Sequence, residues 1–437
     1  MKNFCADQYL NAINSTETVL MKGKITKIIG LVIEADGPSI NLGELCHIYP
    51  RIDAPLLPAE VVGFRENRVL LMPLGEMQGI GPGSEVVSSR NLLRVKVGPS
   101  LLGRILDGLG NPIDGKGPLV AECEYAIQNT PPPPLSRRRI CQPVSVGIRA
   151  IDGLMTLGKG QRMAILAGSG VGKSTMMGMI ARNTSADVNV IALIGERGRE
   201  VLDFIERDLG EEGLKKSVVI VSTSDQPALL RIKGANTATA VAEYFRDQGR
   251  DVMLMMDSLT RVAMAQREVG LTIGEPPATR GYPPSVFAMM PKLLERSGTG
   301  EKGSITGLYA VLVDGDDMNE PIADNVRSIV DGHIVLSRRL ATQNHYPPID
   351  ILASLSRVMT EVVTEDHVKA AQRLRSLQAT YQEAEDLINI GAYVKGSNPE
   401  IDQAIDRNSG IRNFLRQGVM EQAEMTETLV RMKQLVG

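Results

Sequence analysis

The sequence predicts an α/β protein whose parallel-sheet core, residues 98–350, follows a small β-barrel at 21–97 and precedes a helical domain at 351–437. Within the core, short apolar runs alternate with helix-like segments, which is typical of a parallel sheet covered by helices on both faces. Short β-like runs with turn residues at close intervals indicate the barrel, and helical periodicity beyond Ser354 indicates the last domain. Three domains suit a chain of 437 residues, at about 150 residues per domain.

Residues 1–20 precede the barrel and show weak helical periodicity. Two interpretations of this segment remain: a short helix that docks a partner, and a frayed tail. The barrel strands are separated by turn sequences such as Asp36-Gly37-Pro38. They are expected within 25–33, 44–49, 61–64 and 68–72. The proline run 131–134 and the arginines 137–139 after it predict a stiff, extended connector whose arginines face solvent.

Continuous apolar runs in the core predict strands that are buried on both faces. The expected core strands are 163–166, 188–194, 218–221, 252–256, 308–313 and 333–336. The clearest helices of the last domain are expected at 365–387, 399–405 and 411–435.

Composition counts against several classes of function. A formal charge of −3 and 3% aromatic residues favour neither a general polyanion-binding surface nor an aromatic platform for single-stranded nucleic acid. No apolar run approaches the ~18 residues of a transmembrane helix. The N-terminus lacks the pattern of a signal peptide, so a cytosolic protein is expected. The scattered Cys5, Cys46, Cys123 and Cys141 favour reduced thiols over zinc ligands or disulfides.

The strongest motif is the glycine-rich segment AGSGVGKST, which runs from Ala167 to Thr175 between a predicted strand and a predicted helix. Its glycines let the backbone curl so that several N–H groups converge on phosphate oxygens. Lys173 then neutralises the β- and γ-phosphates of a nucleotide, and the Ser174 hydroxyl binds Mg²⁺. Ala167 stands where the usual pattern has Gly, but Gly168 keeps the turn permissive. The predicted nucleotide-binding residues are Gly168, Ser169, Gly170, Val171, Gly172, Lys173, Ser174 and Thr175.

Two acidic residues follow predicted core strands. Asp257 ends a continuous apolar run and is therefore expected at the carboxyl end of a parallel strand, where open α/β sheets bind their ligands. An acid there can hold the water shell of Mg²⁺, and the alternative is an ordinary turn cap. Glu196 is the candidate carboxylate that orients an attacking water. For Glu196 the alternative is an ion pair with Arg197 or Arg199.

Several segments resemble the catalytic subunits of rotary ATP synthases and their relatives. They are the phosphate-binding loop, GERGRE at 195–200 and PPIDILASLS at 347–356. Within that family, further segments look like type III export ATPases: SDQP at 224–227, MDSLTR at 256–261, EPPATRGYPPS at 275–285 and DGDDMNEP at 314–321. LINIGAY at 387–393 and GELC at 43–46 are most similar to the flagellum-specific member. The resemblance covers about residues 20–437 and implies a RecA-like P-loop core.

The resemblance implies an ATPase that uses ATP and Mg²⁺ and assembles as a homohexameric ring. By position, Lys173 matches the catalytic lysine of the phosphate-binding loop, and Ser174 matches its Mg²⁺ ligand. Asp257 matches the Walker B acid, a second Mg²⁺ ligand, and Glu196 matches the catalytic carboxylate.

Three further residues take their roles from the resemblance alone. Arg197 matches a residue that holds the catalytic glutamate or senses phosphate. Arg357 matches the arginine finger that a neighbouring subunit inserts into the site, although the residues alone favour a surface ion pair. Tyr346 matches the aromatic residue that stacks on adenine, and without the resemblance it is a tyrosine that packs in a turn.

The resemblance also implies a cytoplasmic location, peripheral at the inner face of the flagellar export gate. Expected partners are further copies of this chain, a stator-like regulatory protein at residues 1–20, membrane proteins of the gate, and export substrates with their chaperones. A coiled-coil, stalk-like export component is expected at the acidic loop 314–320, for which a solvated turn is the alternative. No nucleic acid is expected as a partner.

The expected function is ATP hydrolysis that energises protein export through the flagellar type III apparatus. The catalytic subunit of a rotary ATPase or ATP synthase is one alternative, and the ATPase of a virulence-type injectisome is another. A ring-shaped RNA translocase is an alternative from a different class. The barrel and C-terminal motifs favour export over a rotary enzyme, and the near-zero charge and sparse aromatics count against RNA.

Overall fold

The computed structural model describes residues 21–51, 55–313, 315 and 317–437. The possible docking helix at 1–20 lies outside the described residues. The chain forms two compact units: residues up to 93 together with 271–275, and the remainder of the chain. Within the described residues, no helix combines the length and the apolar character needed to cross a membrane.

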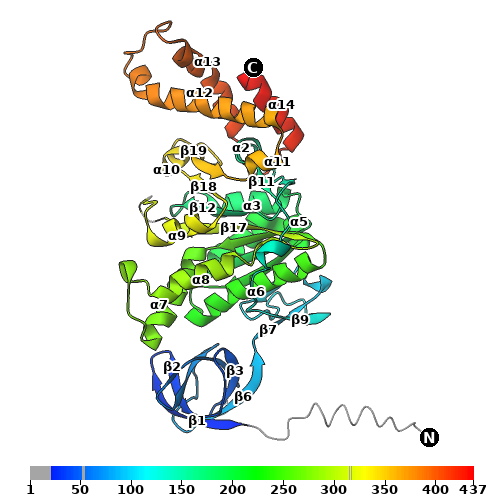
Figure 1. The fold of residues 1–437 in the computed structure, drawn as a ribbon, viewed down its shortest axis with the longest axis vertical. Coiled ribbons are helices and arrows are strands. Elements are labelled where there is room, and N and C mark those ends of the chain that lie inside the picture. Colours follow the sequence, from blue (N-terminus) through cyan, green and yellow to red (C-terminus); the bar gives the residue numbers. More distant parts are fainter. Residues whose placement is uncertain (1–20, 52–54, 314, 316) are drawn as a thin grey trace, which may run out of the picture. The chain divides into compact units, whose positions relative to one another are not determined.

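The first unit contains a closed, antiparallel β-barrel (Figure 1). Its strands are β1 (Lys22–Ile29), β2 (Val32–Asp36), β3 (Glu44–Tyr49), β4 (Leu57–Arg65), β5 (Arg68–Pro73) and β6 (Glu85–Leu92), in the order β1-β2-β5-β4-β3-β6. Alternate residues point inward, and Ile25, Ile33 and Ile48 lie in the barrel core. Gly23 permits a close crossing of the chain, because a Cβ there would lie 2.1 Å from the carbonyl oxygen of Gly37.

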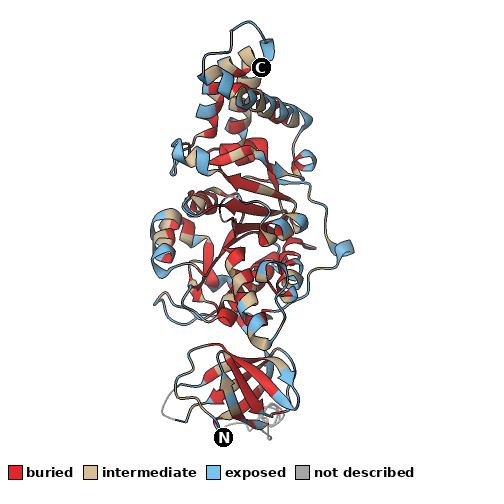
Figure 2. Cartoon of the chain, turned by 90° about the vertical axis from the view of Figure 1, so that its left-hand side faces the viewer, coloured by how far each residue is buried: buried red, intermediate tan, exposed pale blue. Residues whose placement is uncertain are grey.

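The second unit is built on a central sheet with the order β19-β18-β12-β17-β15-β13-β14-β8. Its strands are β8 (Ile105–Asp107), β12 (Arg162–Ala167), β13 (Val188–Ile194), β14 (Ser217–Ser222), β15 (Asp251–Asp257), β17 (Ser304–Leu312), β18 (Gly332–Leu336) and β19 (Ile349–Ser356). Neighbouring strands are parallel, except β19 on β18 and the short β16 (Gly298–Thr299) on β17. The strands between the two edges of the sheet are buried along most of their length, as Figure 2 shows, which is why they appear in the sequence as continuous apolar runs.

Helices flank this sheet. They are α2 (Arg149–Leu154), α3 (Lys173–Asn183), α4 (Gly198–Asp203), the π-helical η3 (Phe204–Leu209), α5 (Gly210–Lys215), α6 (Ala228–Asp247), α7 (Leu259–Ile273), α8 (Pro284–Leu294), α9 (Pro321–Ile329) and α10 (Arg338–Thr342). The long α6 packs on β13, β14 and β15, while α9 packs on β12 and β17.

Short elements complete the unit before the C-terminal helices. β7 (Arg94–Val97) pairs with β9 (Cys123–Ala126), and β10 (Pro143–Val144) pairs with β11 (Leu157–Gly158). The sequence predicts that Arg137 faces solvent, but in the structure its side chain is only 18% exposed. Its guanidinium donates to the carbonyl oxygens of Ser297, at 2.8 Å, and Glu295, because buried carbonyls at the end of α8 need donors.

The C-terminal region is helical, with α11 (Met359–Val362), α12 (Glu365–Asn389), α13 (Pro399–Leu415) and α14 (Met425–Val436). These helices share one hydrophobic core with the sheet, to which Leu374, Phe414 and Met432 belong. The predicted helices 399–405 and 411–435 have the wrong bounds, since α13 continues through 406–410. The non-helical stretch lies at 416–424 instead, where α2 binds the connecting backbone.

Candidate active site

The phosphate-binding loop joins β12, which ends at Ala167, to α3, which begins at Lys173. Gly170 and Gly172 have φ angles of 74° and 94°, in the left-handed region that residues with a side chain adopt at a cost. The loop therefore depends on glycine at both positions. A curled, glycine-rich backbone that leads into a helix N-terminus is a binding site for phosphate groups.

The order of the sheet brings two acidic side chains to this loop. β13 and β15 are neighbours, Leu193 pairs with Asp257, and Glu196 follows directly after β13. Lys173 Nζ forms an ion pair with Asp257 Oδ1 and lies 3.6 Å from Glu196 Oε1. The structure thus places the lysine between both of the acids that the sequence singles out.

A cavity of about 730 Å³ lies at this cluster, within the size range of ligand-binding sites. The predicted residues that line it are Gly168, Ser169, Gly170, Gly172, Lys173, Ser174, Thr175, Glu196 and Arg197. The cavity is also lined by residues to which the sequence assigns no role: Gly195, Glu200, Ser224, Arg261 and Leu312. Val171 and Asp257 are each 2% exposed; Val171 packs into the hydrophobic core, and Asp257 contacts the cavity through Lys173.

Glu196 has the electrostatics of a proton acceptor. Burial raises its pKa to about 7, the negative charge of Asp257 adds to the increase, and the positive charge of Lys173 opposes it. A carboxylate with a pKa close to the working pH is well matched to take a proton from water.

The sequence matches three family descriptions in chain order. They are the β-barrel domain of the ATP synthase alpha/beta family over 25–90, the nucleotide-binding domain of the same family over 147–356, and the C-terminal domain of the type III secretion ATPase EscN over 363–434. A flagellum-specific ATP synthase of Bacillus subtilis is 55% identical over 429 residues, which cover 98% of each chain. The chain is a type III export ATPase of the ATP synthase alpha/beta family.

Further relatives of this export ATPase belong to type III secretion systems. A type 3 secretion system ATPase of Xanthomonas euvesicatoria is 53% identical over 407 residues, 93% of this chain and 92% of that one. The assembled ATPase EscN of the enteropathogenic E. coli type III secretion system has 48% identity and a TM-score of 0.90, over 95% of this chain and all of that one. The predicted fold class, a barrel followed by a mostly parallel sheet and C-terminal helices, is confirmed.

Three predicted site residues of the export ATPase lie at or outside the edge of the cavity. The Arg197 side chain is 82% exposed and lies 3.6 Å from Glu200. The Tyr346 ring lies against the loop, since a Cβ on Gly172 would be 3.7 Å from its Cε1 atom. Arg357 is exposed and donates to the Val330 carbonyl oxygen at 3.3 Å, so within one chain it does not line the cavity.

Arg261 lines the cavity but received no role from the sequence, where it appears only as the last residue of MDSLTR at 256–261. It lies in the first turn of α7, directly after the strand that ends at Asp257, and this position is the signal that could have found it. Its Nε is buried and has no hydrogen-bond partner among the described residues, while Nη1 contacts Met264 Sδ at 3.8 Å. A cation that lines a phosphate-binding cavity is suited to an anionic ligand.

Arg261→Met should lower kcat/KM for ATP about tenfold to a hundredfold, because hydrogen bonds to charged groups are worth about 1.5–3 kcal/mol. Steady-state ATPase kinetics measure the effect. Arg267→Met is the matched control, since Arg267 lies on the same helix and stacks over Tyr282 instead. Equal values of kcat/KM in the two variants would show that Arg261 does not contribute to the nucleotide site.

Proposed function

We propose that this export ATPase energises flagellar protein export and acts as a homohexameric ring in the cytoplasm at the inner face of the export gate. The observation that carries its catalytic part is the cluster of Lys173, Glu196 and Asp257 at one cavity beside the phosphate-binding loop. The similarity of 387–393 and 43–46 to flagellum-specific members supports the flagellar assignment, as does the Bacillus subtilis relative.

In the proposed mechanism, backbone N–H groups of the loop and Lys173 bind the phosphates. Glu196 accepts a proton from the attacking water and orients that water toward the γ-phosphate. Arg197 lies beside Glu196 and holds it or senses phosphate. Tyr346 stacks on adenine at the side of the loop. Arg357 reaches the site of a neighbouring subunit and stabilises charge on the transferring phosphoryl group.

The residues also fit Mg²⁺. Ser174 offers a hydroxyl and Asp257 a carboxylate at one cavity, and hard oxygen donors suit this ion. In the described part of the chain, no group of three His, Cys, Asp or Glu side chains can hold a metal alone, so the ion would bind together with nucleotide phosphates. Bound there, Mg²⁺ supplies charge neutralisation at the phosphates.

Partners follow from the same proposal. One solved relative is the assembled EscN in complex with its central stalk EscO, and that EscN chain is 47% identical to this one with a TM-score of 0.88. By analogy, a coiled-coil stalk component contacts the loop 314–320 of this chain. A stator-like regulator binds residues 1–20. The other proposed partners are membrane proteins of the export gate, export substrates and their chaperones.

Deletion of the gene, followed by complementation, tests the proposal. The wild-type gene should restore flagellar export and motility, and Lys173→Ala should not, because the loop would lose the cation that neutralises its phosphates. Normal motility with a loss of injectisome secretion would assign the chain to a virulence system instead. Hydrolysis by the purified chain that RNA stimulates, with strong salt dependence, would favour an RNA translocase.

A further inference from the structure

Arg149, on α2, binds the backbone that connects α13 to α14. Its side chain is almost fully buried, with the residue 3% exposed. Its Nε donates to the Phe414 carbonyl oxygen at 2.8 Å, its Nη2 donates to the Arg416 carbonyl oxygen, and its Nη1 pairs with Glu421. One guanidinium therefore fixes both sides of Gln417.

The Gln417 side chain in turn binds the backbone of α2 and of the segment just before it. It is 5% exposed, its Oε1 accepts from the backbone N–H of Arg149 at 2.9 Å, and its Nε2 donates to the Gly147 and Glu421 carbonyl oxygens at 2.7 and 2.8 Å. We call Arg149 and Gln417 the clasp. Because both side chains are buried, loss of either would leave unpaired polar groups inside the protein, which is costly.

The clasp reaches the nucleotide site through one further hydrogen bond. The Gln417 N–H donates to the Tyr346 carbonyl oxygen at 2.9 Å, and the Tyr346 ring lies against Gly172 of the phosphate-binding loop. A single chain of contacts thus runs from Arg149 through Gln417 to the tyrosine beside the loop.

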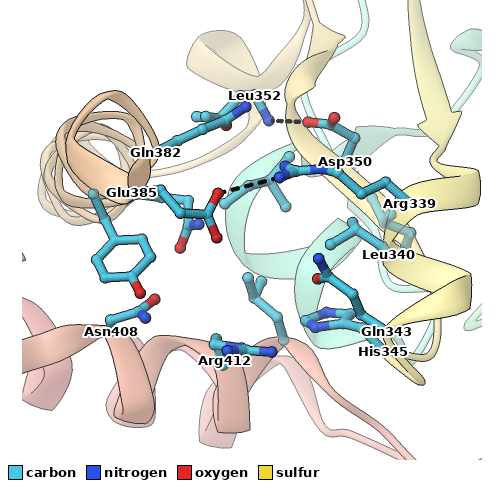
Figure 3. A pocket seen from close by; sticks show the side chains of 15 residues that line it. Arg339, Leu340, Gln343, His345, Asp350, Leu352, Gln382, Glu385, Asn408 and Arg412 are labelled. Carbon is cyan, nitrogen blue, oxygen red and sulfur yellow. Dashed lines mark hydrogen bonds and ion pairs between the residues drawn. The ribbon is translucent and has the colours of Figure 1, made fainter. Parts of the chain in front are cut away.

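The packing around His345, the residue before this tyrosine, is incomplete on one side. A cavity of about 120 Å³ separates α10 and β19 from α12 and α13, and His345 is one of its lining residues (Figure 3). The ion pair of Arg339 with Glu385, at 3.2 Å, crosses it. Asn408 Oδ1 lies buried there without a hydrogen-bond partner among the described residues. Packing leaves space beside His345, so the clasp adds to the backbone hydrogen bonds that hold this segment, such as that from the His345 N–H to the Leu340 carbonyl oxygen at 3.0 Å.

We propose that Arg149 is a positioning residue for the nucleotide base, which acts through Gln417 on Tyr346. The inference rests on the proposed function, in which Tyr346 holds adenine. Without the clasp, the backbone around Gln417 is no longer held so that its N–H meets the Tyr346 carbonyl oxygen; the ring then shifts beside the loop, and the base loses part of its contact surface. The phosphate contacts of Lys173 and the loop backbone are unaffected, so the loss is specific to ligands that carry a base.

Arg149→Met tests this role, because it keeps the length of the side chain and removes its donors. The KM for ATP should rise about tenfold, equal to about 1.4 kcal/mol, with kcat within about twofold. The inhibition constant of tripolyphosphate, which has no base, should stay within about twofold. Lys395→Met, which removes a 72% exposed cation from the same helical region, is the matched control and should leave all three constants unchanged.

An unchanged KM, or equal losses for ATP and tripolyphosphate, would overturn the positioning role. Wild-type protein without ATPase activity would instead overturn the proposed function, so the two failures are distinguishable. If thermal unfolding shows that Arg149→Met does not fold, Gln417→Glu replaces it. That variant keeps the acceptor for the Arg149 N–H and loses both donated bonds, and the same split between ATP and tripolyphosphate is expected.

Discussion

Glu196→Gln is expected to leave ATP binding intact and to lower turnover by about a hundredfold to ten-thousandfold. The substitution keeps the shape of the side chain and removes its ability to take a proton from water. Lys173, 3.6 Å away, keeps its ion pair with Asp257, so the phosphate-binding groups stay in place. Equilibrium binding of a fluorescent ATP analogue and steady-state hydrolysis measure the two effects separately.

Glu206→Gln is the matched control for this variant. Glu206 carries the same carboxylate on the neighbouring η3, is exposed, and lies outside the residues that line the cavity. Its kinetics should equal those of the wild type. Near-normal hydrolysis by Glu196→Gln would show that Glu196 is not the catalytic carboxylate. A loss of ATP binding would show that Glu196 has a structural role.

The pH dependence of the wild type supplies a second measurement on Glu196. Its pKa is raised to about 7, so the residue is protonated and inactive as a base at lower pH. The value of kcat/KM should therefore increase as pH rises toward 7 and level off above it, since this constant reports the free enzyme. In Glu196→Gln the rise should be absent.

Mixed rings of Arg357→Ala and Lys173→Ala subunits should hydrolyse ATP although each variant alone is inactive. An arginine finger contributes about 10³ to 10⁵ in rate, and Arg357 is exposed and outside the cavity of its own chain. In a randomly mixed ring with equal amounts of the two variants, about a quarter of the sites combine an intact Lys173 with an intact neighbouring Arg357. Activity should recover to a comparable fraction of the wild type.

Two affinity tags, one on each variant, establish that mixed rings have formed before activity is measured. Mixing two batches of Lys173→Ala subunits with different tags is the control and should give no activity. Absence of recovery in rings shown to contain both variants would mean that Arg357 does not act across the subunit boundary.

Features that depend on local backbone conformation and residue order can be predicted from the amino-acid sequence alone. The phosphate-binding loop is one example, because the left-handed φ angles of Gly170 and Gly172 require glycine whatever surrounds them. The positions of Glu196 and Asp257 at strand ends are another, since buried parallel strands are continuous apolar runs whose ends are visible in the sequence.

Contacts between groups that are distant in the sequence become visible only in the folded chain. Lys173 and Asp257 are 84 positions apart, and Arg149 and Glu421 are 272 apart, so their contacts depend on strand order and on how α2 packs against the C-terminal helices. The physical reason is that the spacing of apolar residues shows which face of a helix or strand a side chain lies on. The residue that it contacts depends on strand register and on packing between elements, which no local pattern encodes.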